Sequence, residues 1–117
     1  MTKKVTVLYS KPVEETLTFL EQTKENNKIS NSIYNSFLKK IELIKNNPNY
    51  GNNIPKSQIP KEYIEKYKIN NLFRIELSNY WRCLYTLIDE KENKIEIIAF
   101  VIDFLDHDKY NKKFKYK

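Results

Sequence analysis

Two arginines are the residues of this sequence best suited to phosphate chemistry. Arg74 and Arg82 are the only arginines among 21 basic residues, and both fall in one candidate β-hairpin. A guanidinium is planar and permanently charged, so it grips a phosphate through two parallel hydrogen bonds, which the ammonium of lysine cannot do. Nearly every other basic residue of the chain is a lysine, so arginine at these two positions favours an anion-binding role. The alternative is a structural ion pair, for instance between Arg82 and Glu76 across the hairpin.

Groups that can transfer protons follow the last predicted strand. His107 is the only histidine, and Tyr110 lies one helical turn after it. Cleavage of RNA requires few catalytic groups from the protein, because the 2′-hydroxyl of the substrate can serve as the nucleophile. The protein must hold the backbone in line, neutralise the five-coordinate phosphate and move two protons. The arginines suit the first two tasks. The histidine and the tyrosine suit the third, although a structural role is the alternative for each.

Other chemistries find less support in the sequence. Cys83 and His107 are each the only residue of their type, and their spacing from the acids matches no metal-binding motif. The acids beside the histidine are better explained as helix-capping residues, namely Asp103, Asp106 and Asp108. Cys83 lies within a predicted strand, where a buried structural cysteine is the ordinary case. With Gly51 as the only glycine, the chain has no glycine-rich phosphate loop. We therefore expect neither a metal nor another cofactor.

Composition narrows the class of protein. The chain has 117 residues, and we expect one domain over residues 1–117. The net charge of +6 favours a polyanionic partner such as nucleic acid, although the codon bias of an AT-rich genome would explain it equally well. No apolar run approaches the roughly 20 residues of a membrane span. No signal peptide is recognisable, and a single cysteine fits a reducing compartment. These features predict a cytoplasmic protein without a membrane partner.

The first half of the chain predicts a strand and a helical hairpin. β-branched residues predict a strand at residues 4–9, and helical spacing of apolar residues predicts helices at 12–25 and 30–45. Ser30 or Asn31 is expected to cap the second helix. The short link between the helices indicates an antiparallel pair whose apolar stripes form core.

The second half predicts an antiparallel sheet, which makes the fold class α+β. Strands are expected at residues 72–77, 81–88 and 94–104, with 97–102 in a central strand covered on both faces. The proline-containing connection before them should form a helical turn or two at residues 61–67. It should also pack three side chains onto the sheet edge: Ile59, Tyr63 and Ile64. A short C-terminal helix is expected to begin near Asp106, capped by Asp106 or Asp108.

Basic and aromatic side chains at the end of the chain are candidate RNA contacts. Five lysines and no acid follow Asp108, and the candidates are Lys109, Lys112, Lys113, Lys115 and Lys117. A solvated chain end is the alternative for this segment. Trp81 is expected in the core, where it serves packing, whereas an exposed tryptophan would stack on a base.

Four segments carry a resemblance to a known family. They are Asn47-Pro48 with Gly51 shortly after, the strand Leu72-Phe73-Arg74-Ile75-Glu76-Leu77, the strand Tyr80-Trp81-Arg82-Cys83-Leu84-Tyr85, and Asp106-His107-Asp108-Lys109-Tyr110. In these segments and in the order of its elements the chain resembles the RelE/ParE superfamily of toxins from type II toxin–antitoxin systems. The resemblance is strongest over residues 80–85.

The resemblance implies a RelE-like fold and a ribosome-dependent endoribonuclease that cleaves messenger RNA without a metal and is neutralised by an antitoxin protein. Arg82 matches the arginine that contacts the scissile phosphate, and Arg74 matches a basic residue of the preceding strand. His107 falls where members carry a general acid, and Tyr110 matches a tyrosine that orients the substrate. Glu76 is a departure, because cleaving members often have a basic residue there, although some use a glutamate as base.

Two other functions remain open on the same fold. One is a toxin of the ParE type that inhibits gyrase, a branch that generally lacks the catalytic basic and proton-transfer residues. The other is an RNA-binding domain without catalytic activity, which the departure at Glu76 and the long connection at residues 54–71 keep under consideration.

Overall fold

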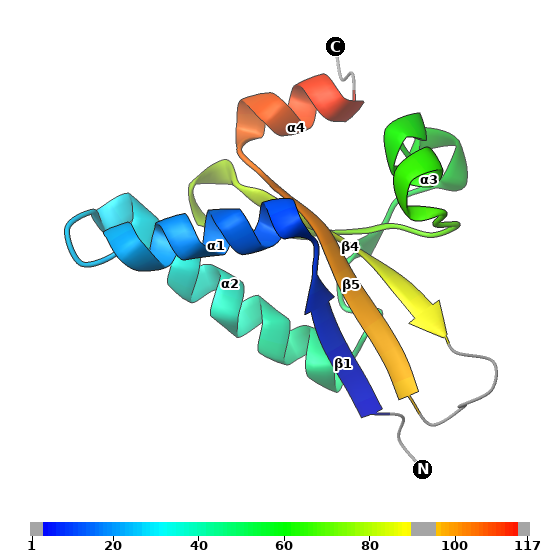
Figure 1. Cartoon of the computed structure of the whole chain (residues 1–117), viewed down its shortest axis with the longest axis horizontal. Coiled ribbons are helices and arrows are strands. Elements are labelled where there is room, and N and C mark those ends of the chain that lie inside the picture. Colours follow the sequence, from blue (N-terminus) through cyan, green and yellow to red (C-terminus); the bar gives the residue numbers. More distant parts are fainter. Residues whose placement is uncertain (1–3, 90–95, 115–117) are drawn as a thin grey trace.

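The computed structural model describes residues 4–89 and 96–114, which form an α+β fold around one five-stranded sheet. The strand order is β1-β5-β4-β3-β2, and helices lie on both faces of the sheet (Figure 1). In the described part of the chain, no helix has the length and apolar character needed to cross a membrane. The α+β class that the sequence predicts is confirmed.

The predicted elements appear in the predicted order, although most of their ends shift by a few residues and a two-residue strand at Asn52–Asn53 was not predicted. The strands are β1 (Lys4–Tyr9), β2 (Asn52–Asn53), β3 (Phe73–Glu76), β4 (Arg82–Asp89) and β5 (Glu96–Leu105). The α-helices are α1 (Lys11–Thr23), α2 (Lys28–Asn46), α3 (Lys61–Tyr67) and α4 (His107–Phe114). Two short 3₁₀ turns complete the fold: η1 (Lys56–Gln58) and η2 (Ser78–Tyr80). The sequence also predicts a turn at residues 89–93, between the second and third strands of the meander, and these residues lie largely outside the described part of the chain.

The sheet is mixed, which corrects the expectation of a purely antiparallel sheet. Strands β3, β4 and β5 form the predicted antiparallel meander. Strand β1 pairs with β5 in parallel, with Val5 opposite Ile97 and Tyr9 opposite Val101. The two helices that follow β1 carry the chain back across the sheet before β3 begins, so β1 and β5 run in the same direction. Strand β5 is therefore internal, as its apolar sequence predicts.

Helices α1 and α2 cover one face of the sheet. Ser10 caps α1 by accepting a hydrogen bond from the amide of Val13 at 3.3 Å, and its hydroxyl donates to the carbonyl of Ile102 at 2.9 Å. The cap of α2 is Asn27, whose side chain accepts from the amides of Ile29 and Ser30. The helix thus begins two residues before the predicted start at Ser30. Its apolar stripe packs on the sheet as predicted, through Ile33, Phe37, Ile41 and Ile44.

The connection from β2 to β3, together with α3 and α4, covers the other face. Ile59 and Tyr63 are buried there against residues of β4, β5 and α4. Both pack onto the sheet as expected, although over its face and not at its edge. Ile64 is 40% exposed, so its predicted packing was wrong. The hydroxyl of Tyr63 donates to a carboxylate oxygen of Asp103 at 2.6 Å, which links α3 to β5. Figure 1 shows α3 and α4 near the same end of the sheet.

Candidate active site

The strand register brings both arginines to the α3–α4 face of the sheet. Arg74 of β3 lies opposite Leu84 of β4, and Glu76 lies opposite Arg82. Because side chains alternate along a strand and opposite residues share a face, these residues point to the same side. The arginines are diagonal neighbours on adjacent strands. Arg82 also lies opposite Leu105, the last residue of β5, so α4 starts directly beside it.

Tyr110 of α4 organises the two guanidinium groups. The carbon of the Arg82 guanidinium lies 4.7 Å from the centre of the tyrosine ring, and that of Arg74 lies 6.0 Å from it. A terminal nitrogen of Arg74 donates to the hydroxyl of Tyr110 at 3.2 Å. The ring stacks on Phe114 at 4.4 Å, and the residue is 1% exposed. A cation over an aromatic face is attracted by the ring quadrupole, so one buried ring fixes two positive groups that repel each other.

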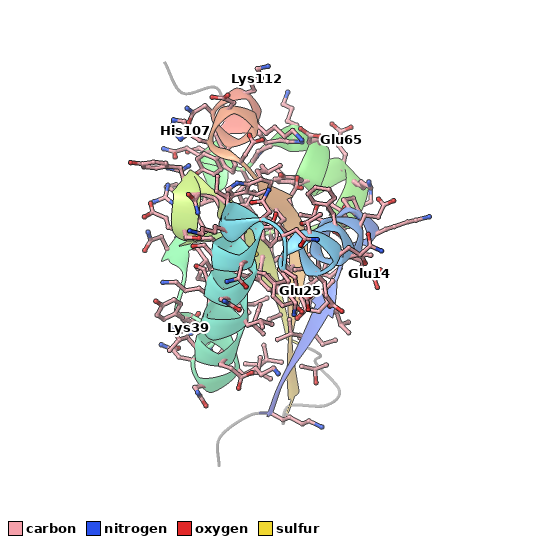
Figure 2. All side chains as sticks on the ribbon, turned by 90° about the vertical axis from the view of Figure 1, so that its left-hand side faces the viewer. Glu14, Glu25, Lys39, Glu65, His107 and Lys112 are labelled. Carbon is pink, nitrogen blue, oxygen red and sulfur yellow. The ribbon has the colours of Figure 1, made fainter. Side chains whose placement is uncertain are left out.

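His107 lies at the start of α4, beside Arg82. Nη1 of Arg82 is 3.2 Å from Nδ1 of the imidazole, and the amide nitrogen of Asn111 is 3.1 Å from Nε2. Arginine only donates, so in this contact Nδ1 accepts and Nε2 carries the proton. The proton on Nε2 needs an acceptor, so the side-chain oxygen of Asn111, and not its nitrogen, faces the ring. The two atoms of an amide are assigned from the hydrogen bonds that they make. His107 is exposed, and Figure 2 shows it at one end of the molecule together with Lys112.

Among the described residues, one carboxylate lies near this pair of arginines. A carboxylate oxygen of Glu76 lies 4.0 Å from a terminal nitrogen of Arg74, at the limit of an ion pair. The side chain of Glu76 is 64% exposed, and such a pair contributes little. No carboxylate of the described residues comes within ion-pair distance of Arg82, so the expected alternative of an Arg82–Glu76 salt bridge is not realised. Arg82 instead donates to the carbonyl of Tyr80 at 3.0 Å.

The lysines of α4 separate into two kinds. Lys109 and Lys112 are exposed, as an RNA contact requires. Lys113 is engaged within the protein, because its ammonium lies 2.9 Å from Glu62, 4.0 Å from Asp103 and 5.2 Å from the centre of the Tyr63 ring. The side chain therefore joins α4 to α3, and its assignment as an RNA contact stays a prediction. Lys115 and Lys117 lie outside the described residues.

The only glycine of the chain anchors the strand that carries Arg74. The hydroxyl of Tyr85 donates to the carbonyl of Pro48 at 2.7 Å and accepts from the amide of Gly51 at 2.9 Å. A Cβ on Gly51 would lie 2.9 Å from the Tyr85 ring and 3.0 Å from the carbonyl oxygen of Arg74. Burial raises the pKa of Tyr85 to about 12, so the phenol stays protonated and can donate. The segments at residues 47–51, 72–77 and 80–85, which carry the family resemblance, are thus in contact around Gly51.

The turn η2 holds an exposed aromatic side chain beside the site, which the sequence did not single out. Asn79 and Tyr80 have φ of 58° and 62°, in the left-handed region, which costs roughly 1–2 kcal/mol for a residue with a Cβ. Tyr80 is 74% exposed, and its ring centre lies 5.9 Å from that of His107. Trp81 turns to the opposite face and packs edge-on against Phe104 at 5.5 Å. Tyr80 is therefore the more exposed of the two aromatic residues.

Other reactive groups lie away from this arrangement. Cys83 is fully buried, and burial raises the pKa of its thiol, which leaves it protonated and inert. Among the side chains of residues 4–88 and 97–114, no three of His, Cys, Asp or Glu come together in a way that could hold a metal ion. Comparison of the sequence with family models, with curated proteins and with solved structures found no match. The geometry of the site therefore carries the functional argument.

Proposed function

We propose that this protein is a toxin of the RelE type, an endoribonuclease that cleaves messenger RNA by attack of the 2′-hydroxyl on the adjacent phosphate. One observation carries the proposal: two guanidinium groups converge over the buried ring of Tyr110, and an imidazole lies 3.2 Å from one of them. Two fixed cations beside a proton-transferring group match the demands of phosphodiester cleavage in RNA. The resemblance at residues 80–85 supports the same reading.

The proposed step needs no group outside the protein and the substrate. The 2′-oxygen forms a bond to phosphorus while the bond from phosphorus to the 5′-oxygen breaks, which leaves a 2′,3′-cyclic phosphate and a free 5′-hydroxyl. Arg82 and Arg74 neutralise the charge that builds on the phosphate oxygens. His107 gives a proton to the leaving 5′-oxygen, and Glu76, next to Arg74 and exposed, receives the proton of the 2′-hydroxyl.

Arg82 and His107 are placed to bind the same phosphate. Nη1 of Arg82 lies 3.2 Å from Nδ1 of the imidazole. A phosphate oxygen between the two side chains would accept a hydrogen bond from each, because the guanidinium and a protonated ring nitrogen are both donors. The imidazole is therefore adjacent to the atom at which the scheme needs an acid.

Tyr110 acts as a positioning residue in this proposal. It was expected to touch the substrate, yet it is 1% exposed, with its hydroxyl at Arg74 and its ring under Arg82. Direct proton transfer to RNA from such a buried phenol would require α4 to move. Holding the two guanidiniums at a fixed separation requires no movement.

The proposal includes the partners that the family resemblance implies. The substrate is messenger RNA on the ribosome in the cytoplasm, and an antitoxin protein masks the basic face until it is removed. Lys109 and Lys112, exposed on α4, extend the positive charge beyond the arginines toward this RNA. Their contacts would be salt-sensitive, because each phosphate neutralised by a lysine releases counterions.

Cleavage mapping tests the proposal. The purified protein is added to ribosomes translating a defined messenger, and new RNA ends are located by primer extension. The end groups are identified by whether kinase can label the 5′-hydroxyl without prior phosphatase treatment. We expect new 5′-hydroxyl ends with the native protein and none with Arg82→Ala.

Two further variants make this result specific to the site. Arg82→Lys keeps the charge and loses the two-point grip, so it should retain only a small part of the activity. Lys39→Ala removes one positive charge from α2, on the other face of the sheet and away from His107 in Figure 2, and should cleave like the native protein. An uncut messenger with a folded native protein would refute the nuclease proposal and leave gyrase inhibition or RNA binding without cleavage on this fold.

A further inference from the structure

Tyr80 has features that its packing does not explain. Its side chain is 74% exposed, the largest exposure given for any large hydrophobic residue of the described chain. Its φ of 62° lies in a region that glycine or asparagine adopts at lower cost. A residue that is strained and contributes little to the core is not kept there by stability. Strain of this kind, when the surrounding structure maintains it, is found at binding and catalytic sites.

The backbone of Tyr80 is tied to the proposed phosphate site. Its carbonyl accepts the hydrogen bond from Nη1 of Arg82, and the same nitrogen lies beside His107. The ring itself lies at an angle of 61° against the imidazole, at 5.9 Å between centres. The phenol is thus held at a fixed offset from the groups that would hold the scissile phosphate.

The surroundings of the ring suit a nucleobase. A hollow of about 420 Å³ lies beside it, lined by Glu76, Leu77, Asn79, Tyr80, Trp81 and Arg82. This volume is within the range of sites for small organic groups. The hollow offers an exposed aromatic ring, a guanidinium and polar side chains, the combination that proteins use to stack an unpaired base next to a bound phosphate.

We infer that Tyr80 is a stacking residue for single-stranded RNA, which receives the base of a nucleotide flanking the phosphate bound by Arg82. This inference rests on the proposed function for the identity of the ligand and adds a binding subsite to it. An aromatic platform accepts every base, so the subsite fixes the position of the strand and not its sequence. The left-handed backbone at Tyr80 is the conformation that presents the ring outward while its carbonyl still reaches Arg82.

A fluorescent oligonucleotide separates binding from cleavage. The probe is a short 2′-O-methyl oligoribonucleotide that contains 2-aminopurine, which keeps its bases and phosphates and cannot be cut because its 2′-oxygens are blocked. Stacking on an aromatic ring quenches 2-aminopurine. We expect quenching with the native protein and with Tyr80→Phe. Tyr80→Gly and Tyr80→Asn, which suit the left-handed backbone, should lose the quenching and bind about 10-fold more weakly.

Matched variants exclude a structural cause. Lys39→Ala changes a side chain of α2 away from the hollow and keeps the ring, so it should bind the probe like the native protein. Phe19→Ala removes another exposed ring, on α1 over the other sheet face, and should also have no effect on binding. Thermal unfolding should show Tyr80→Gly to be at least as stable as the native protein, because glycine adopts a positive φ freely.

The outcomes for the two proposals differ. Quenching that depends on Tyr80, with no cleavage of a natural messenger, would uphold the subsite and overturn the nuclease. Normal affinity and normal cleavage by Tyr80→Gly would overturn the subsite alone. Failure of the native protein to bind the probe would also overturn the subsite. If Tyr80→Gly bound RNA normally and lost only its association with another protein, the ring would belong to a protein interface and the subsite would be overturned.

Discussion

The role of Tyr110 can be measured by removing one oxygen atom. Tyr110→Phe keeps the ring that lies under Arg82 and stacks on Phe114, and it removes the hydroxyl to which Arg74 donates at 3.2 Å. The buried ring continues to fill its place in the core, so the fold should persist. The change therefore loosens Arg74 and leaves the other groups of the site in position.

The expected magnitude separates positioning from proton transfer. A hydrogen bond from a charged group contributes roughly 1.5–3 kcal/mol. The side chain of Arg74 is 25% exposed and lies 4.0 Å from Glu76, so it can recover part of that energy from water and from the carboxylate. The loss should therefore lie at the lower end of that range, about 1.5 kcal/mol. Each 1.4 kcal/mol of activation free energy is about a factor of ten in rate, so Tyr110→Phe should slow cleavage about 10-fold. Loss of a general acid or base would instead cost about 100-fold to 10,000-fold.

Single-turnover cleavage of a ribosome-bound messenger gives the rate, and the same variant is measured in an Arg74→Ala background. If Tyr110 acts through Arg74, its hydroxyl has no further effect once Arg74 is absent, and the two changes are not additive. A loss beyond about 100-fold for Tyr110→Phe, with full additivity and a changed pH–rate profile, would refute the positioning role and assign proton transfer to the phenol.

Three further predictions concern the frame of the site. Gly51→Ala should lower the free energy of unfolding by about 1–3 kcal/mol and reduce cleavage, because its Cβ would lie 3.0 Å from the carbonyl oxygen of Arg74; chemical denaturation and the cleavage assay check the two effects, and unchanged stability would contradict the packing given above. Burial holds the pKa of Tyr85 at about 12 in the folded protein, above its ordinary value near 10. The protonated phenol therefore contributes its full stability below about pH 10, and this contribution is lost as the pH rises toward 12. In Tyr85→Phe the free energy of unfolding should fall less steeply with pH over this range, and a fall as steep as that of the native protein would contradict the assignment. Lys113→Ala should lower the free energy of unfolding by about 1 kcal/mol, because it loses contacts with Glu62 and the Tyr63 ring. Lys112→Ala should leave the free energy of unfolding unchanged and reduce the salt dependence of RNA binding. Equal effects of the two variants in both assays would mean that α4 is oriented differently.

Local features of the sequence determine most of the elements. The strand at Lys4–Tyr9 and the helix at Lys61–Tyr67 have the predicted bounds, and β3, β4 and β5 form the predicted meander. The helical stripe of α2 is core as expected. These features depend on periodicity and on turn-forming residues within a few positions, which is information that a single sequence contains. The start of α2 was misplaced because Ser30 and Asn27 are both residues that can cap a helix. The side chain of Asn27 accepts from the amides of Ile29 and Ser30, whereas the hydroxyl of Ser30 accepts from Thr23.

The composition of the site was visible in the sequence, and its geometry was not. The types and spacing of Arg74, Arg82 and His107 already favoured phosphate chemistry. Whether they meet depends on the pairing register of β3, β4 and β5, which joins positions far apart in the chain. The register places Arg82 opposite Leu105, and from there α4 brings His107 and Tyr110 to the arginines.

The tertiary structure decided which similar residues differ in role. Lys112 and Lys113 are neighbours of the same type, yet one is exposed and the other is held by Glu62, because successive residues of a helix point 100° apart. Tyr80 and Trp81 are likewise adjacent, and the turn at η2 leaves one ring exposed and packs the other, partly buried, against Phe104. The sequence determined which chemical groups this protein has and in which elements they lie. Long-range packing determined which of those groups are exposed, because burial depends on partners that sequence distance does not reveal.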